Sequence, residues 1–360
     1  MVCSLDHGID YRTDVHTHLS SATSRFSYAA QNSRRFFCAP DTSHGSVVVS
    51  HQFTTKKVHN HITLWANNEK DSEESRTFPT TGFSFIDSER CFEEEEIPDY
   101  QANRFYPVEL GQIVQDRYQI IAKFGFGSSS TTWLARDLQA HRYVALKIYV
   151  HTSLVHRELP LYHHIAGHVG DSSHPGRRNI RSLLDSFEIK GPDGNHLVLV
   201  FDPAQMSLRD MKVVFFPDGF HEDFVRGAVI ELLKGLDFLH TQAEIVHTDV
   251  HPGNMLLGAY DNQIFKTLEE KEFTSPVPRK NVSGTRTIYL SRAMRPREGP
   301  MLLSDFGEAR IGPGPHGGDI MPLEYRAPET LLYVCWSYPV DIWSVDLTVR
   351  SKPRRFRSLR

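Results

Sequence analysis

Cysteine is scarce in this chain, and its distribution excludes several classes of protein. The four cysteines, Cys3, Cys38, Cys91 and Cys335, lie far apart and form no Cys-x-x-Cys pair. A disulfide framework and a cysteine zinc site both require closely spaced sets, so we expect reduced thiols in an intracellular protein, cytoplasmic or nuclear. No run of about 18 apolar residues occurs, so no transmembrane helix is expected. The first residues also lack the basic start and apolar stretch of a secretory signal.

Neither sign of charge is in large excess. The chain has 40 Lys and Arg against 44 Asp and Glu, which gives a net charge of −4. Without a strong overall field, neither a nucleic acid nor a membrane surface is expected as a partner. Hydrophobic residues make up 39% of the chain, so some segment is expected to remain outside the core.

The first segment, residues 1–90, contains much Ser, Thr, His and Asn without sustained periodicity. This composition predicts a disordered leader. The alternative is a mitochondrial presequence, because several arginines lie in a Ser-rich context, but three early aspartates disfavour it. The acidic run Glu93–Glu96 marks the predicted boundary, and residues 91–117, which contain it, are expected to form an extension of the next domain.

From residue 118 onward the sequence predicts an α+β fold with two lobes. Short β-branched and aromatic runs begin at Tyr118, Thr131 and Tyr143 and predict three antiparallel strands, and residues 196–201 predict a fourth. Apolar residues then recur at helical spacing over residues 222–240. A sheet-rich half followed by a helix-rich half indicates a small lobe over 118–204 and a large lobe over 205–346.

Two features of the small lobe indicate phosphate binding. Gly125 and Gly127 lie between the first two strands, where a backbone without Cβ atoms can approach phosphate oxygens. No helix follows this loop, which excludes the Rossmann and Walker arrangements. Lys147 follows in Val-Ala-Leu-Lys, on a central strand where an ammonium group needs an anionic partner. A lysine whose stem covers apolar surface is the plainer alternative.

The large lobe carries the residues expected for phosphoryl transfer. Asp249 and Asn254 lie five residues apart in one segment, and Asp305 begins an Asp-Phe-Gly sequence. A carboxylate that accepts a hydroxyl proton, together with an amide and a second carboxylate for Mg²⁺, suits this chemistry. Tyr325-Arg-Ala-Pro-Glu329 and Asp341-Ile-Trp-Ser follow in the order typical of one enzyme family.

Over residues 118–346 the sequence resembles the eukaryotic protein kinase family, and more narrowly the fungal members of the SR-protein kinase (SRPK) group. The narrower resemblance rests on Arg104-Phe-Tyr-Pro-Val108, Ser130-Thr-Thr-Trp-Leu134, His174-Pro-Gly176 and Thr248. It implies a two-lobed, ATP- and Mg²⁺-dependent serine/threonine protein kinase, monomeric, whose protein substrate is rich in Arg and Ser.

The resemblance also implies roles for individual residues. The catalytic set comprises Asp249 as base, Lys147 on the α/β-phosphates, its partner Glu158, and His251. The metal ligands are Asn254 and Asp305. The nucleotide is expected to contact a set of loop, strand and linker residues: Gly125, Gly127, Ser130, Thr132, Ala145, Lys147, Asp202 and Ala204.

Several departures from the family pattern favour an alternative function. His251 replaces a lysine near the γ-phosphate, and Pro160 is predicted to distort the approach of Lys147 to Glu158. The large lobe is expected to be incomplete and followed by a basic tail, residues 347–360. An insert at about 258–300 is predicted to be a surface loop with a short helical piece. The alternative is a catalytically impaired pseudokinase or truncated fragment that acts as a binding module.

Overall fold

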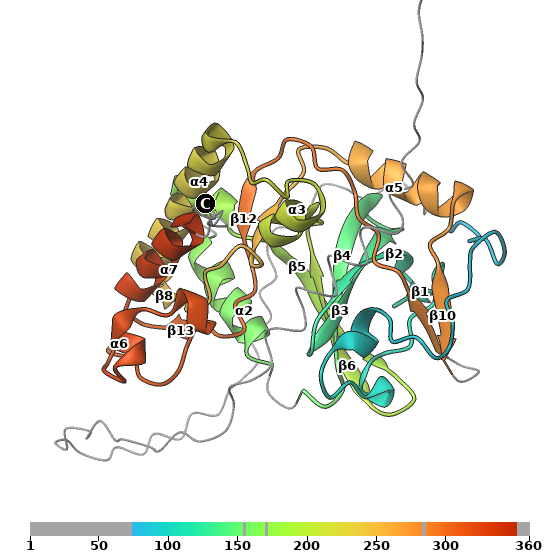
Figure 1. Ribbon diagram of the computed structural model, residues 1–360, viewed down its shortest axis with the longest axis horizontal. Helices are drawn as coiled ribbons and strands as arrows, with labels where there is room; N and C mark the ends of the chain where they lie inside the picture. Colours follow the sequence, from blue (N-terminus) through green and yellow to red (C-terminus); the bar gives the residue numbers. More distant parts are fainter. Residues whose placement is uncertain (1–73, 154–155, 170–171, 283–285, 351–360) are drawn as a thin grey trace, which may run out of the picture.

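The protein folds into a sheet-rich lobe and a mainly helical lobe, as the sequence predicts (Figure 1). The computed structural model describes residues 74–153, 156–169, 172–282 and 286–350. Strands of the small lobe form one antiparallel six-stranded sheet in the order β1-β2-β3-β4-β6-β5. The α+β class and the two-lobed arrangement are therefore confirmed.

The sheet contains the four predicted strands and two more. Its members are β1 (Ile113–Val114), β2 (Tyr118–Phe126), β3 (Ser130–Asp137), β4 (Arg142–Tyr149), β5 (Leu183–Lys190) and β6 (Asn195–Phe201). The central strand β4 is mostly buried on both faces, which explains its nearly continuous apolar sequence. The edge strand β5 is only half-buried and carries polar residues, so its sequence gives no clear strand signal.

The large lobe is built on the predicted helix, which the structure places at α4 (Glu222–Thr241). Its first turn carries Glu222 and Asp223, whose charges suit the positive end of the helix dipole. Helix α7 (Pro339–Arg350) packs against it, and the same lobe contains α3 (Leu208–Val214) and α6 (Pro328–Leu331). Among the described residues, no helix has the length and apolar character needed to cross a bilayer.

Two small sheets connect distant parts of the large lobe. β7 (Met206–Ser207), β9 (Met255–Leu257) and β12 (Met301–Leu303) form one sheet in the order β12-β9-β7. β8 (Ile245–Val246) pairs with β13 (Arg310–Ile311) in the other. These pairings bring together segments separated by the whole insert, and they position the candidate site.

One of the buried apolar clusters continues from one lobe into the other through α2 (Glu158–Val169). Leu161, Tyr162 and Ile165 of this helix join the same buried cluster as Phe201 of the sheet and Phe238 of α4. The lobes are therefore coupled by packed side chains as well as by the linker after β6 (residues 202–205).

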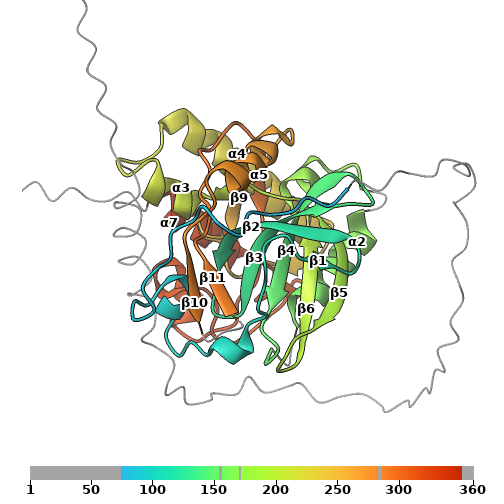
Figure 2. The same cartoon turned by 90° about the vertical axis from the view of Figure 1, so that its right-hand side faces the viewer.

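The insert contains the predicted helical piece, but the rest of it is not a surface loop, and that part of the prediction was wrong. It contains α5 (Gln263–Thr274) and a hairpin of β10 (Arg279–Val282) and β11 (Arg286–Tyr289), and Figure 2 shows the hairpin beside β3. Phe265 of α5 is buried against the sheet residues Tyr143 and Leu134. Glu269 is also buried, where it accepts hydrogen bonds from Arg136 and Tyr143.

The packed part of the chain begins before residue 91, so the predicted boundary at residue 90 needs correction. Phe78 is buried in the same cluster as Phe265, and Phe85 pairs with Arg279 of the insert. Lys280 Nζ lies 2.8 Å from a carboxylate oxygen of Glu95. Residues 74–96 and the insert thus fold together over the small lobe. Residues 1–73, which make up most of the predicted leader, lie outside the described residues, as do 351–360.

The packing of the insert predicts a large effect of Phe265→Ala on stability. Phe265 is 1% exposed, so the substitution leaves a cavity and is expected to lower the free energy of unfolding by about 3–5 kcal/mol. Tyr260→Ala is the matched control, because Tyr260 lies in the same insert and is 74% exposed, and its effect should stay within about 0.5 kcal/mol. Chemical denaturation measures both. Equal unfolding midpoints for the two variants would show that α5 contributes no stability.

Candidate active site

The glycine-containing turn between β2 and β3 leaves open space at both glycines. Gly127 N donates to Ser130 O at 2.8 Å, which closes the turn between the two strands. A Cβ atom added to Gly125 or Gly127 would meet no protein atom within 4 Å. The protein's own packing therefore does not require glycine here, and the open space suits a ligand that approaches the backbone closely.

Lys147 lies between two carboxylates that come from different parts of the chain. Its Nζ is 2.7 Å from Glu158 Oε2 and 3.5 Å from Asp305 Oδ2. Burial alone would lower the pKa of Lys147, but Asp305 and Glu158 outweigh it and raise the pKa well above its usual range. The charge of Lys147 in turn holds the pKa of Asp305 below its usual range, although burial opposes this. The predicted pairing of Lys147 with Glu158 is thus present in the structure.

Pro160 does not distort this approach, and the contrary prediction was wrong. Helix α2 begins at Glu158, so Pro160 lies in its first turn. The first N–H groups of a helix have no partner within the helix, so the missing N–H of proline costs little there. The carboxylate of Glu158 also lies at the positive end of the helix dipole, which favours its charge.

Tyr149 is a functional candidate that the sequence reasoning missed. Its hydroxyl donates to Glu158 Oε2, the same oxygen that receives Lys147. Burial and the adjacent carboxylate raise the pKa of Tyr149, so the phenol stays protonated and acts as a donor. The signal was present in the sequence, because residues two apart on a strand share one face, and Ala145, Lys147 and Tyr149 follow that spacing.

The loop after β8 positions Asp249 and Asn254. Asn254 Nδ2 donates to the Asp249 carboxylate at 2.8 Å and to the Asp249 backbone oxygen at 2.9 Å. The carboxylate is oriented by these bonds, yet the Asp249 side chain remains 22% exposed. His251 accepts a hydrogen bond from Gly253 N through Nδ1 at 3.0 Å, which leaves the proton on Nε2, 3.5 Å from Asp249 Oδ1.

Asp305 reaches this loop because of the strand pairing between β9 and β12. Leu303 pairs with Met255, and Ser304 N donates to Asn254 O at 3.0 Å. Asp305 is 51 positions after Asn254 in the sequence, yet the pairing places the two residues beside each other. The structure therefore brings Lys147, Glu158, Asp249, Asn254 and Asp305 together in one site between the lobes.

Asp341 binds the backbone of the loop after β8, just before Asp249. Its carboxylate is fully buried and accepts hydrogen bonds from His247 N and Thr248 N, both at 2.8 Å, and interacts with His240 Nε2 at 2.8 Å. Thr248 has a φ of 65°, which is strained for a β-branched residue. The strain persists because Asp341 and a 2.7 Å bond from Thr248 Oγ1 to Glu308 O fix the backbone.

Aromatic side chains form a column that runs from the sheet to the loop after β8. Ring centroids are 5.2 Å apart between Phe201 and Tyr162, 5.1 Å between Tyr162 and Phe306, and 5.0 Å between Phe306 and His247. The column joins the sheet, α2, the segment after Asp305 and the loop after β8. A shift of any one of these elements would disturb the packing of the others.

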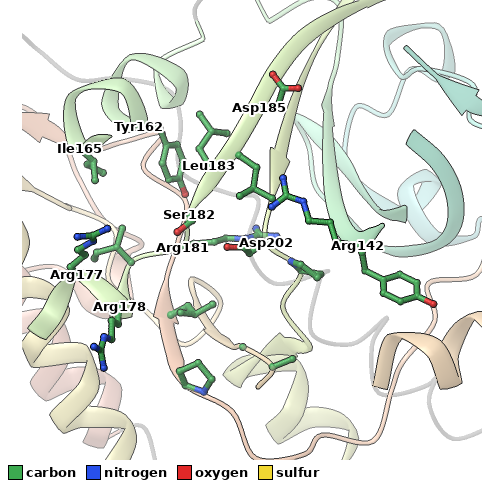
Figure 3. Close-up of a pocket in the computed structure, with 18 of the residues that line it drawn as sticks. Arg142, Tyr162, Ile165, Arg177, Arg178, Arg181, Ser182, Leu183, Asp185 and Asp202 are labelled. Carbon is green, nitrogen blue, oxygen red and sulfur yellow. The ribbon is translucent and has the colours of Figure 1, made fainter. Parts of the chain in front are cut away.

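The remaining predicted nucleotide contacts lie on the small lobe and its linker. Ser130 and Ala145 are buried on adjacent strands, and Thr132 pairs with Lys147 across β3 and β4. Ala204 is buried in the linker after β6. The side chain of Asp202 instead lines a cavity behind the linker, so only its backbone can serve the cleft (Figure 3).

Comparison with known proteins gives concordant matches along the chain. The protein kinase domain family matches residues 118–351. A serine/threonine protein kinase of Aspergillus fumigatus is 41% identical over 279 residues, which are 76% of this chain and 67% of that protein. The serine/threonine-protein kinase SRPK of Physarum polycephalum is 29% identical over 71% of this chain and 65% of its own length. Human SRSF protein kinase 3 is 32% identical over 54% of this chain and 35% of its own length.

The fold comparison agrees with these sequence matches. A crystallised kinase domain superimposes with a TM-score of 0.52 at 23% identity, over 68% of this chain and 67% of that one. Protein kinases as a family use ATP and a divalent metal, and they act on protein substrates. The chain belongs to the protein kinase family and is a serine/threonine protein kinase with relatives in the SRPK group.

Proposed function

We propose that this chain transfers the γ-phosphate of ATP, with Mg²⁺, to serine in Arg/Ser-rich protein segments. The observation that carries the proposal is the assembled cluster of Lys147, Glu158 and Asp305 opposite the Asp249–Asn254 pair. The preference for Arg/Ser-rich segments rests on the relatives named as SRPK and SRSF protein kinases.

The residues of the cleft fit ATP and a divalent cation. Mg²⁺ prefers oxygen ligands, which Asp305 and the Oδ1 atom of Asn254 offer. Lys147 supplies a fixed positive charge for phosphate oxygens, and the open turn at Gly125 and Gly127 admits them to backbone N–H groups. When bound, ATP supplies the phosphoryl group and the metal neutralises charge on it.

The residues of the proposed site then have distinct roles in the reaction. Asp249 accepts the proton of the substrate hydroxyl, and the bond from Asn254 holds its carboxylate in place. Glu158 and Tyr149 fix the position of Lys147, which orients the phosphates. His251 presents Nε2–H toward the same region and carries no fixed charge when neutral.

The function is tested by peptide phosphorylation with the full chain and its Asp249→Asn variant. We expect the variant to lose about 10²–10⁴-fold in kcat, because a proton acceptor is removed from the reaction. Binding of a non-hydrolysable ATP analogue, measured by calorimetry, should be retained. An Arg-Ser repeat peptide should be preferred over a Lys-Ser peptide of the same length and charge. Equal turnover by the wild type and the variant would contradict the role of Asp249. No turnover by either protein would favour the binding-module alternative.

His251→Lys is expected to raise kcat by about ten-fold. A lysine places a permanent charge where negative charge develops on the transferring group, and ten-fold corresponds to only about 1.4 kcal/mol. Steady-state kinetics with the Arg-Ser peptide measures the effect, and His221→Lys, at an exposed position before α4, controls for added charge. A lower kcat in His251→Lys would indicate that the imidazole itself has a role in the reaction.

The activation segment is expected to need no phosphate. Residues 305–329 contain no serine or threonine, and Thr248 occupies the position where many kinases carry an arginine that binds a phosphate. The segment is fixed by other contacts: β13 pairs with β8, and Arg326 Nε donates to Ile320 O and Met321 O at 3.1 Å. Treatment with a broad phosphatase should leave kcat unchanged. Activity that disappears and returns only with an upstream kinase would refute this prediction.

A further inference from the structure

The carboxylate of Glu308 lies between two arginines that come from different segments of the chain. Its Oε2 atom is 3.8 Å from Arg157 Nη1 and 3.8 Å from Arg310 Nη2. Arg157 immediately precedes α2, whereas Arg310 begins β13. At this distance the contacts are ion pairs and not hydrogen bonds, so the three groups are held by their charges, with little dependence on orientation.

The backbone at Glu308 is bound as well. Its carbonyl oxygen accepts a hydrogen bond from Thr248 Oγ1 at 2.7 Å and another from Arg310 Nη1. Arg310 also pairs with Val246 across β13 and β8. The side chain of Glu308 therefore projects from a segment that is fixed to the large lobe, whereas Arg157 belongs to the segment that leads into α2.

Glu308 and Arg157 join the same two segments that supply the carboxylates bound to Lys147. Arg157 is adjacent to Glu158 in the sequence, and Glu308 follows closely after Asp305. Lys147 attracts both Glu158 and Asp305, but those two carboxylates carry like charges and repel each other. A contact between opposite charges at the edge of the same two segments offsets this repulsion.

The exposure of this second contact limits what it can contribute. The side chains of Arg157 and Glu308 are 55% and 54% exposed. Ion pairs at a surface add little to the stability of the whole fold, and salt screens them. A small contribution is nevertheless sufficient to shift a local equilibrium, because two arrangements of a helix can differ by a small free energy. We therefore expect an effect on α2 and not on the fold as a whole.

We propose that Glu308 is a positioning residue for phosphoryl transfer. Its contacts with Arg157 and Arg310 hold α2 against the segment that follows β12, and Glu158 then remains beside Lys147 before ATP binds. The consequence for turnover rests on the proposed kinase function, whereas the link between α2 and the large lobe does not. The carboxylate is a permanent part of the chain, so the link needs no phosphate on the segment after β12.

Hydrogen exchange of the α2 backbone, measured by mass spectrometry on the full chain without nucleotide, tests the link. Glu308→Gln and Arg157→Met each remove one charge and keep most of the side chain. We expect each substitution to raise exchange in α2 at least about two-fold at low salt. The effects should be less than additive in the double variant, because both substitutions remove the same contact.

Two controls separate charge from other effects of substitution. Arg157→Lys keeps the charge and should exchange as the wild type does. Glu222→Gln removes an exposed ion pair with Arg226 on α4 and should leave exchange in α2 unchanged. In about 1 M salt, where the screening length is about 3 Å, Glu308→Gln and the wild type should exchange alike.

Turnover of the Arg-Ser peptide completes the test. We expect Glu308→Gln to lower kcat/KM at least about two-fold and Arg157→Lys to restore the value lost in Arg157→Met. The proposal fails if both neutral variants exchange at the wild-type rate, if Arg157→Lys behaves as Arg157→Met does, or if the difference persists in 1 M salt. It also fails if exchange rises while kcat/KM is unchanged. Absence of turnover in the wild type would refute the proposed function, and the exchange rates alone would then decide the link.

Discussion

The ammonium group of Lys147 interacts with two carboxylates that lie on separate segments, and the geometry of the cleft depends on that interaction. Glu158 begins α2, whereas Asp305 follows β12, so the two contacts join the sheet to both. Lys147 and Glu158 are buried, with side chains 12% and 4% exposed, and buried charges are stable only when they are paired, so removal of one member leaves the other uncompensated. The pKa of Lys147 is raised and that of Asp305 is lowered, so both groups stay charged around neutral pH.

The surrounding structure supports this cluster through aromatic packing, a buried carboxylate and ion pairs. The aromatic column from Phe201 to His247 packs behind it, and Asp341 fixes the backbone at His247 and Thr248. On the outer side of the small lobe, buried ion pairs join the sheet to residues 74–96 and to the insert: Lys123 to Glu94, and Arg136 to Glu269. The small lobe is thus supported from both faces by segments outside the strands themselves.

The sequence predicted the parts of this structure that depend on local spacing. Helix α4 follows from apolar periodicity, and the cleft residues follow from short motifs in a fixed order. The packing of the insert could not be predicted in this way, because Phe265 contacts Tyr143 across more than a hundred residues. The burial of charged residues cannot be predicted from the sequence either. Glu269 lies in a charged helical stretch typical of a surface, and only the fold shows that it bonds to Arg136 and Tyr143. The cavity behind the linker combines residues from six segments and leaves no sequence pattern.

The effect of Pro160 depends on where helix α2 begins, which the sequence does not show. A proline near a functional glutamate suggests distortion when the helix is assumed to extend to both sides. The structure starts α2 at Glu158 instead, which makes the same proline compatible with a 2.7 Å contact to Lys147. This removes one of the observations that favoured a catalytically impaired protein.

The central claim is that the cluster around Lys147 assembles in the unphosphorylated chain without help from another protein. A crystal structure of that form with a non-hydrolysable ATP analogue and Mg²⁺ tests it most directly. We predict Lys147 Nζ within hydrogen-bond distance of Glu158, at about 2.7–3.2 Å, with the metal bound by Asp305 and Asn254. A structure in which Glu158 is turned away from Lys147, or in which the metal lies on other residues, would contradict it.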